Sequence, residues 1–132
     1  MTAASFPTGS PSPSDRSSAV ALLGREPLTD FAVAVRCPHG GPAVLRNEPV
    51  DLRGRPFPTR FWLACRALSE AVSRLEAAGG VRALEADEAM RPALLAAQRR
   101  HAGLHAGHLI AGAGDPGHVK CLHAHLAFAL AE

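Results

Sequence analysis

A helical pattern in the middle of the chain is the strongest constraint on its fold. Apolar residues recur there at the i, i+3, i+4 and i+7 spacing of one helix face, in the order Leu68, Ala71, Val72 and Leu75. Gly79 and Gly80 end this pattern. Before it, residues 31–35 alternate larger side chains with alanine, which is typical of a strand with its larger side chains on one face. Strands followed by helices indicate an α+β fold.

We expect a small two- or three-stranded sheet near residues 31–64, covered by three to four helices. Strands are predicted at 31–35 and at 43–46. Helical segments are predicted at 16–23 with Asp15 as the N-cap, between Cys65 and Gly79, at 81–90, and from Pro92 through Gln98. A last helix is predicted from Pro116, with Asp115 as its N-cap.

The N-terminal segment differs in composition from the rest of the chain. Residues 1–14 are rich in Ser, Pro, Gly and Thr, and they contain one large apolar side chain besides the initial Met. Such a segment buries too little surface to offset its ordering entropy. We therefore expect a disordered tail over residues 1–14 and a single α+β domain over residues 15–132.

The charges and cysteines limit the classes of function. The 14 Lys and Arg nearly balance the 12 Asp and Glu, so there is no strong nucleic-acid signal. Three cysteines cannot all pair within one chain, which favours a reducing cytoplasm over a secreted disulfide scaffold. No apolar run approaches the ~18 residues of a membrane span. A soluble cytoplasmic protein is expected.

The three cysteines suggest a shared metal site. Cys37 ends the first strand before a turn rich in Pro and Gly, Cys65 begins a helix, and Cys121 lies close to two histidines. Thiolates beside imidazoles suit zinc or an iron–sulfur cluster. Two geometries remain open at Cys121. In a regular helix it shares a face with His125, whereas in a loop it pairs with His123.

Other interpretations compete with a metal site. Free cysteines are common as buried apolar residues. A histidine series at positions 101, 105 and 108 is expected to be a solvated helix face. Alternatively, the protein could bind a phosphate or nucleotide in a basic pocket formed by Arg36, Arg55, Arg60 and Lys120. It would then be a binding protein, or an enzyme that also uses Cys65.

A set of short motifs resembles the bacterial "domain of unknown function 501" family. They are residues 23–27 (LGREP), 36–42 (RCPHGGP), 56–59 (PFPT), 63–65 (LAC), 73–76 (SRLE) and 119–123 (VKCLH). The resemblance covers nearly everything after the tail. It implies that Cys37, Cys65, Cys121 and His123 occupy characteristic family positions, and it implies no activity. Arg66 stands where the family usually has proline, and family members often continue into an Asn-Pro-containing tail.

With the resemblance added, we expect a Cys3His metal site. Its thiolates would be Cys37, Cys65 and Cys121, with His123 or His39 as the fourth ligand. The expected cofactor is a structural zinc ion or an iron–sulfur centre in an accessory or regulatory protein. We expect the protein to bind either another protein or a small anionic ligand.

Overall fold

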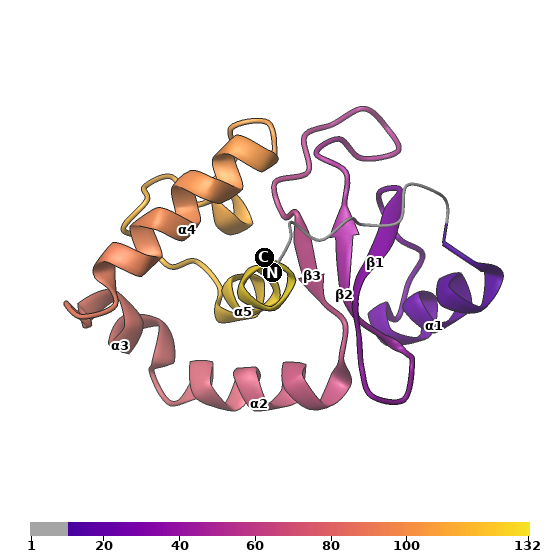
Figure 1. The fold of residues 1–132 in the computed structure, drawn as a ribbon, viewed down its shortest axis with the longest axis horizontal. Helices are drawn as coiled ribbons and strands as arrows, with labels where there is room; N and C mark the ends of the chain where they lie inside the picture. Colours follow the sequence, from indigo (N-terminus) through magenta and orange to yellow (C-terminus); the bar gives the residue numbers. More distant parts are fainter. Residues whose placement is uncertain (1–10) are drawn as a thin grey trace.

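The computed structural model describes residues 11–132, which form a three-stranded antiparallel sheet and five α-helices (Figure 1). In chain order the elements are α1 (Pro13–Leu23), β1 (Phe31–Arg36), β2 (Pro42–Asn47), β3 (Phe61–Leu63), α2 (Arg66–Ala77), α3 (Gly80–Ala86), α4 (Arg91–Leu104), the short 3-10 helix η1 (Ile110–Gly112) and α5 (Leu122–Ala131). The predicted α+β class is confirmed. The described residues contain more helices than the expected three to four.

The sheet has helices on both faces. Its strand order is β1-β2-β3, and Val44 and Leu45 of β2 are both buried. Val44 packs in a cluster with Phe128 of α5, whereas Leu45 packs in a second cluster with Ala19 of α1. Figure 1 shows α1 on one side of the sheet and α5 on the other. Alternate residues of β2 therefore serve two different cores.

Strand β1 departs from simple alternation. The pairing register with β2 shifts between Val33 and Val35, as in a β-bulge. Phe31 and Val33 pack in the cluster on the α1 side, while Val35 packs against the other cluster. The prediction that all three larger side chains share one face was wrong, because a bulged residue turns the following side chains over.

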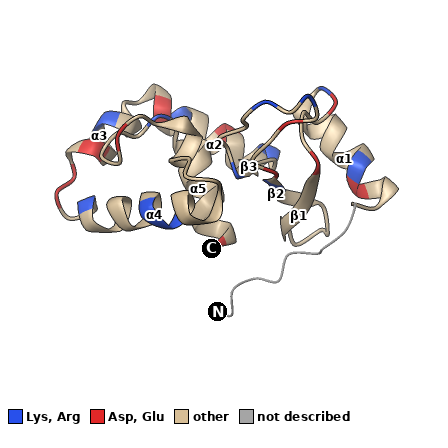
Figure 2. Ribbon diagram, turned by 90° about the horizontal axis from the view of Figure 1, so that it is seen from above, with Lys and Arg blue, Asp and Glu red and all other residues tan. Residues whose placement is uncertain are grey.

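Helix α5 lies at the centre of the molecule, between β3 and the helices α2 and α4 (Figure 1). Its buried residues pack on the sheet, and the ring of Phe128 lies 5.9 Å from the ring of Phe61. None of its residues is Asp, Glu, Lys or Arg, and it is tan throughout in Figure 2, whereas α3 carries an acidic and a basic residue and α4 carries arginines. Burial on several sides explains why α5 is apolar.

Two predicted helix starts were wrong. Helix α1 begins at Pro13, because Ser12 rather than Asp15 is its N-cap: the Ser12 hydroxyl accepts a 3.0 Å hydrogen bond from the Asp15 N–H. Residues 1–10 of the expected tail lie outside the described residues, whereas its last two residues belong to α1.

The last helix begins at Leu122 and not at Pro116. Asp115 closes a tight turn, since its carboxylate and carbonyl accept the N–H groups of Gly117 and His118. The Val119 N–H then donates to the carboxylate of Glu85, at 2.8 Å. These bonds hold residues 115–119 in a turn and an extended segment, so the local cap signal is overridden.

Burial also differs from expectation along two helices. His101 and His105 are 2% and 0% exposed, so the expected solvated histidine face is wrong for both. In α2 Val72 is buried, but Leu68 and Leu75 are exposed. Within residues 11–132, no helix is long and apolar enough to cross a membrane.

Candidate metal centre

The start of α5 is fixed by a side chain from α2. The Leu122 N–H donates a 2.8 Å hydrogen bond to Oε2 of Glu76. Cys121 occupies the N-cap position of α5 in an extended conformation, with no side-chain cap of its own. The carboxylate of Glu76 therefore caps a helix that begins 46 residues later in the chain.

This contact brings three candidate metal ligands together. Sγ of Cys121 lies 3.7 Å from Nδ1 of His123, and Oε1 of Glu76 lies 3.3 Å from the same nitrogen. One ligand atom from each residue falls within 4.8 Å of the others, and all three residues are half-buried. Of the two geometries open from the sequence, the loop geometry is the one observed, with Cys121 and His123 adjacent.

The other ring nitrogen of His123 is held by α2. Nε2 lies 3.0 Å from the carbonyl oxygen of Ser69 and 3.1 Å from the hydroxyl of Ser73. A carbonyl oxygen only accepts, so Nε2 carries the hydrogen in this contact. In the neutral ring Nδ1 then presents a lone pair toward Cys121 and Glu76. Histidines that bind metals usually donate their second N–H in this way.

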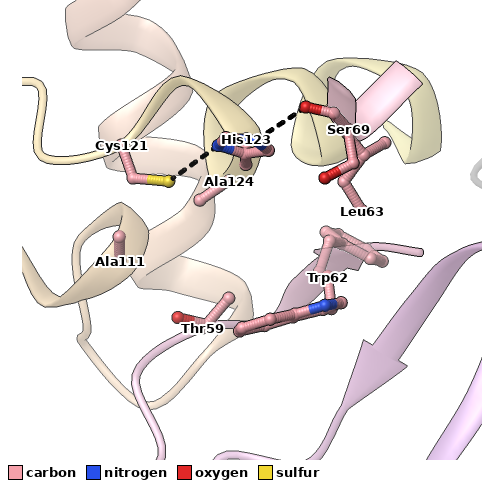
Figure 3. Close-up of a pocket in the computed structure, with 9 residues that line it drawn as sticks. Thr59, Trp62, Leu63, Ser69, Ala111, Cys121, His123 and Ala124 are labelled. Atoms are coloured by element: carbon pink, nitrogen blue, oxygen red, sulfur yellow. Dashed lines mark hydrogen bonds between the residues drawn. The ribbon is translucent and has the colours of Figure 1, made fainter. Parts of the chain in front are cut away.

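A pocket of about 280 Å³ opens beside Cys121 and His123 (Figure 3). It lies between β3, the start of α2, η1 and the start of α5. Figure 3 shows Trp62 across the pocket from His123. Its remaining lining residues are Thr59, Phe61, Leu63, Ser69, Ala111 and Ala124. A ligand bound here would reach the sulfur of Cys121 directly.

The structure does not bring the other predicted metal ligands into this group. Cys37 and His39 lie in the turn between β1 and β2, and the Cys37 N–H donates to the Gly41 carbonyl. Cys65 is the N-cap of α2, and its N–H donates to the Ala43 carbonyl at 3.1 Å. Among the described residues, the one group of three candidate ligands pairs Cys121 and His123 with Glu76. All three cysteines are free thiols.

His125 faces different surroundings from His123. Burial lowers its pKa to about 4, and the neighbouring His101 contributes in the same direction. It lines a separate, larger groove of about 730 Å³ formed by α2, α3, α4 and α5. It therefore does not join Cys121 as a ligand.

The predicted basic pocket is not assembled. Arg36 pairs with Asp15 at 2.8 Å, and this hydrogen bond lowers the pKa of Asp15. Arg55 pairs with Asp51 at 3.1 Å, within its own turn. Arg60 donates to the Leu104 carbonyl at 2.8 Å, and burial lowers its pKa.

Lys120 is exposed, although it precedes Cys121 directly. It does not line the pocket beside that cysteine, and neither do Arg36, Arg55 or Arg60. None of the four basic residues predicted to bind an anion lines this pocket, and the three arginines are engaged with acidic or carbonyl groups elsewhere.

Sequence reasoning assigned no role to Ser69, Ser73 or Glu76, although residues 73–76 form one motif of the resemblance. These three residues recur at i, i+4 and i+7 on one face of α2, beside the apolar pattern. A polar stripe at this spacing reads as a solvated helix face. The motif at residues 73–76 is a sequence signal that points to this stripe, but only tertiary packing places the stripe beside Cys121.

The comparisons with known proteins identify a family and no function. The chain matches no curated protein and no solved structure. Residues 33–109 match the model of the family described as "Protein of unknown function (DUF501)". This range includes Cys37, Cys65 and Glu76, while residues 23–27 and 119–123 of the resemblance lie outside it. Since the match spans more than half of the 132 residues, the chain belongs to the DUF501 family.

Proposed function

We propose that the protein binds one zinc ion through Glu76, Cys121 and His123, with a fourth coordination position facing the pocket. The donor atoms would be Oε1, Sγ and Nδ1. A carboxylate, a thiolate and an imidazole are all ligands that zinc accepts. An iron–sulfur cluster suits this site poorly, because such clusters are held by several thiolates and the group contains one.

One observation carries the proposal. Nδ1 of His123 faces two electron-rich atoms, while Nε2 is committed to the Ser69 carbonyl. With the ring neutral, three lone-pair donors converge with no hydrogen between the nitrogen and the carboxylate. The three lone pairs repel one another, and a cation at their centre would be coordinated by all three.

The geometry favours an accessible zinc over a closed structural one. Closed structural sites use four protein ligands, whereas three protein ligands leave one position for water or a bound molecule. The pocket adjoins Cys121 and His123, so the fourth position would be reached from there. A sensing or accessory role and a catalytic role both use such a position. A reducing cytoplasm, the setting we propose, would keep Cys121 as a thiol.

A proton is the main rival to a metal. If Nδ1 of His123 carried a second hydrogen, the imidazolium would pair with Glu76, and the group would serve only to cap α5. Cys121 could then act as a nucleophile beside His123. A metal titration separates these readings.

The test is isothermal titration with zinc of tag-free, reduced protein. We expect about one zinc ion per chain. Cys121→Ser should lower the affinity by more than about tenfold, because it removes the thiolate. Cys37→Ser and Cys65→Ser are matched controls, since both residues are half-buried free thiols outside the group, and they should leave the affinity unchanged.

Two results would overturn the proposal. Absence of stoichiometric zinc binding would leave Cys121, His123 and Glu76 as a helix cap. Equal losses in all three cysteine variants would instead support the Cys3His site predicted from the sequence.

A further inference from the structure

The pocket beside the proposed zinc site has walls without charge. Its apolar lining comes from Phe61, Trp62, Leu63, Ala111 and Ala124. Thr59 and Ser69 add polar groups beside Cys121 and His123, and none of the described residues that line the pocket is Lys, Arg, Asp or Glu. Pockets of this kind bind apolar molecules and orient them through a few polar atoms.

The basic residues beside β3 are not among the residues that line the pocket. The Cζ atom of Arg25 lies 5.9 Å from the centre of the Trp62 ring. Arg60 precedes Phe61, and its guanidinium donates to the Leu104 carbonyl at 2.8 Å. Its Cζ atom lies 5.3 Å from the centre of the Phe61 ring. A phosphate group in the pocket would find no cation among the lining residues besides the proposed zinc. Phosphorylated ligands and nucleotides are therefore disfavoured.

The size of the pocket limits the ligand to a small molecule. Its volume of about 280 Å³ is roughly nine times the ≈ 30 Å³ that a water molecule occupies in the liquid. A ligand of on the order of ten non-hydrogen atoms fits this space. That size corresponds to one aromatic ring with a short substituent or a second small ring.

One wall is held in a strained conformation. Ala111 of η1 has φ 57° and ψ 20°, in the left-handed region that side chains other than glycine rarely adopt. Gly112 follows with φ 72°, and a Cβ atom there would lie 3.1 Å from Cγ of Pro58. Strain kept at the wall of a pocket often marks a site shaped for a ligand.

Resting on the proposed zinc site, we propose that this pocket binds a small, uncharged molecule with one aromatic ring. The ring would lie against Trp62, and one nitrogen or sulfur atom of the molecule would occupy the fourth position of the metal. Trp62 and Phe61 supply the aromatic contacts, while Cys121 and His123 place the metal at the opposite wall (Figure 3).

The test uses cobalt(II), whose visible absorption reports its ligands, in place of zinc. Three probes are titrated into the cobalt-loaded protein: 4-phenylimidazole, imidazole and phenyl phosphate. Because burial of the phenyl ring adds to coordination, 4-phenylimidazole should bind at least about tenfold more tightly than imidazole. Phenyl phosphate carries the same ring but two charges, and it should bind more weakly than 4-phenylimidazole.

Variants of Trp62 locate the ring. Trp62→Ala should reduce the preference for 4-phenylimidazole over imidazole by about fivefold, while the cobalt affinity stays unchanged. Trp62→Phe keeps an aromatic face and should retain most of the preference. Trp62 is 38% exposed, so the substitutions remove little of the core.

The outcomes separate the two proposals. Failure to bind cobalt would overturn the zinc site itself. Normal cobalt binding with no preference for 4-phenylimidazole over imidazole would overturn only the ligand class. Tighter binding of phenyl phosphate, or a preference that Trp62→Ala leaves intact, would overturn it as well.

Discussion

At the scale of single residues, the carboxylates of Glu76 and Glu85 form a natural comparison. Each accepts a backbone N–H at 2.8 Å and lies beside a histidine ring nitrogen. Only Glu76 also has a cysteine within reach. The two residues therefore separate the capping role of a carboxylate from its role as a metal ligand.

We expect Glu76→Gln to lower the zinc affinity by more than about tenfold while costing little stability. The amide oxygen still accepts the Leu122 N–H, but the negative charge that favours the cation is lost. Glu85→Gln is the matched control and should leave zinc binding unchanged. Equal effects of the two substitutions on zinc affinity, measured by competition with a chromophoric chelator, would contradict the assignment of Glu76.

His105 predicts a dependence of stability on pH. Burial lowers its pKa to about 4, and its Nε2 lies 2.8 Å from the Phe57 carbonyl. In the unfolded chain the pKa returns to about 6.5. The unfolded state then binds more protons below that pH. The contribution of His105 is therefore complete above pH 6.5 and is lost as the pH falls toward 4.

The expected loss over that range is about 3 kcal/mol in the free energy of unfolding. His105→Gln keeps a donor for the Phe57 carbonyl but cannot titrate, so urea unfolding between pH 7 and pH 4 should show a smaller decline. His39→Gln, at an exposed position, should leave the decline as in the wild type. An unchanged decline in His105→Gln would refute this account.

At the scale of elements, local patterns predicted α2 well and α5 poorly. The apolar spacing of α2 and the glycines that follow it are properties of the segment itself, and the helix spans Arg66–Ala77. The start of α5 depends on two carboxylates from other elements, Glu85 and Glu76. No rule based on neighbouring residues contains those bonds, so the cap signal at Asp115 was misleading.

The candidate site shows the same division. The sequence singled out Cys121 and His123, because a thiol two residues from an imidazole is a local pattern. Glu76 is distant in the chain, and only the packing of α2 against α5 brings it into the group. The sequence placed the expected partners Cys37 and Cys65 at the ends of elements near the sheet. Such a pattern locates the end of an element, but it does not give the distance of these cysteines from α5.

The element η1 gives a prediction of its own. Gly112 has φ 72°, and a Cβ atom there would approach Pro58, so Gly112→Ala should lower the unfolding free energy by about 1–3 kcal/mol. Gly114 lies two residues later with nothing within 4 Å of an added Cβ atom. Gly114→Ala should therefore be close to neutral. Equal stability of the two variants in chemical denaturation would contradict the close contact at η1.

At the scale of the whole molecule, the proposed site joins two segments that are far apart in the sequence. Its ligands come from α2 and from the start of α5, and α5 packs on β3. A metal that binds only the folded chain stabilises all of it. Zinc at 100 times its dissociation constant should add about 2.7 kcal/mol to the unfolding free energy.

This stabilisation is measured by thermal unfolding with and without zinc, with Cys121→Ser as the control. We expect the midpoint to rise in the wild type and to rise less in the variant, whose affinity for zinc is lower. A rise of equal size in both proteins would place the stabilising zinc elsewhere.

The most direct test of the central claim is X-ray absorption at the zinc edge on tag-free protein loaded with zinc. The spectrum reports how many sulfur atoms surround the metal. Coordination through Glu76, Cys121 and His123 predicts about one sulfur, with the remaining ligands nitrogen or oxygen. Three sulfur atoms would instead point to Cys37, Cys65 and Cys121 together, and protein that retains no zinc would contradict a metal site of either kind.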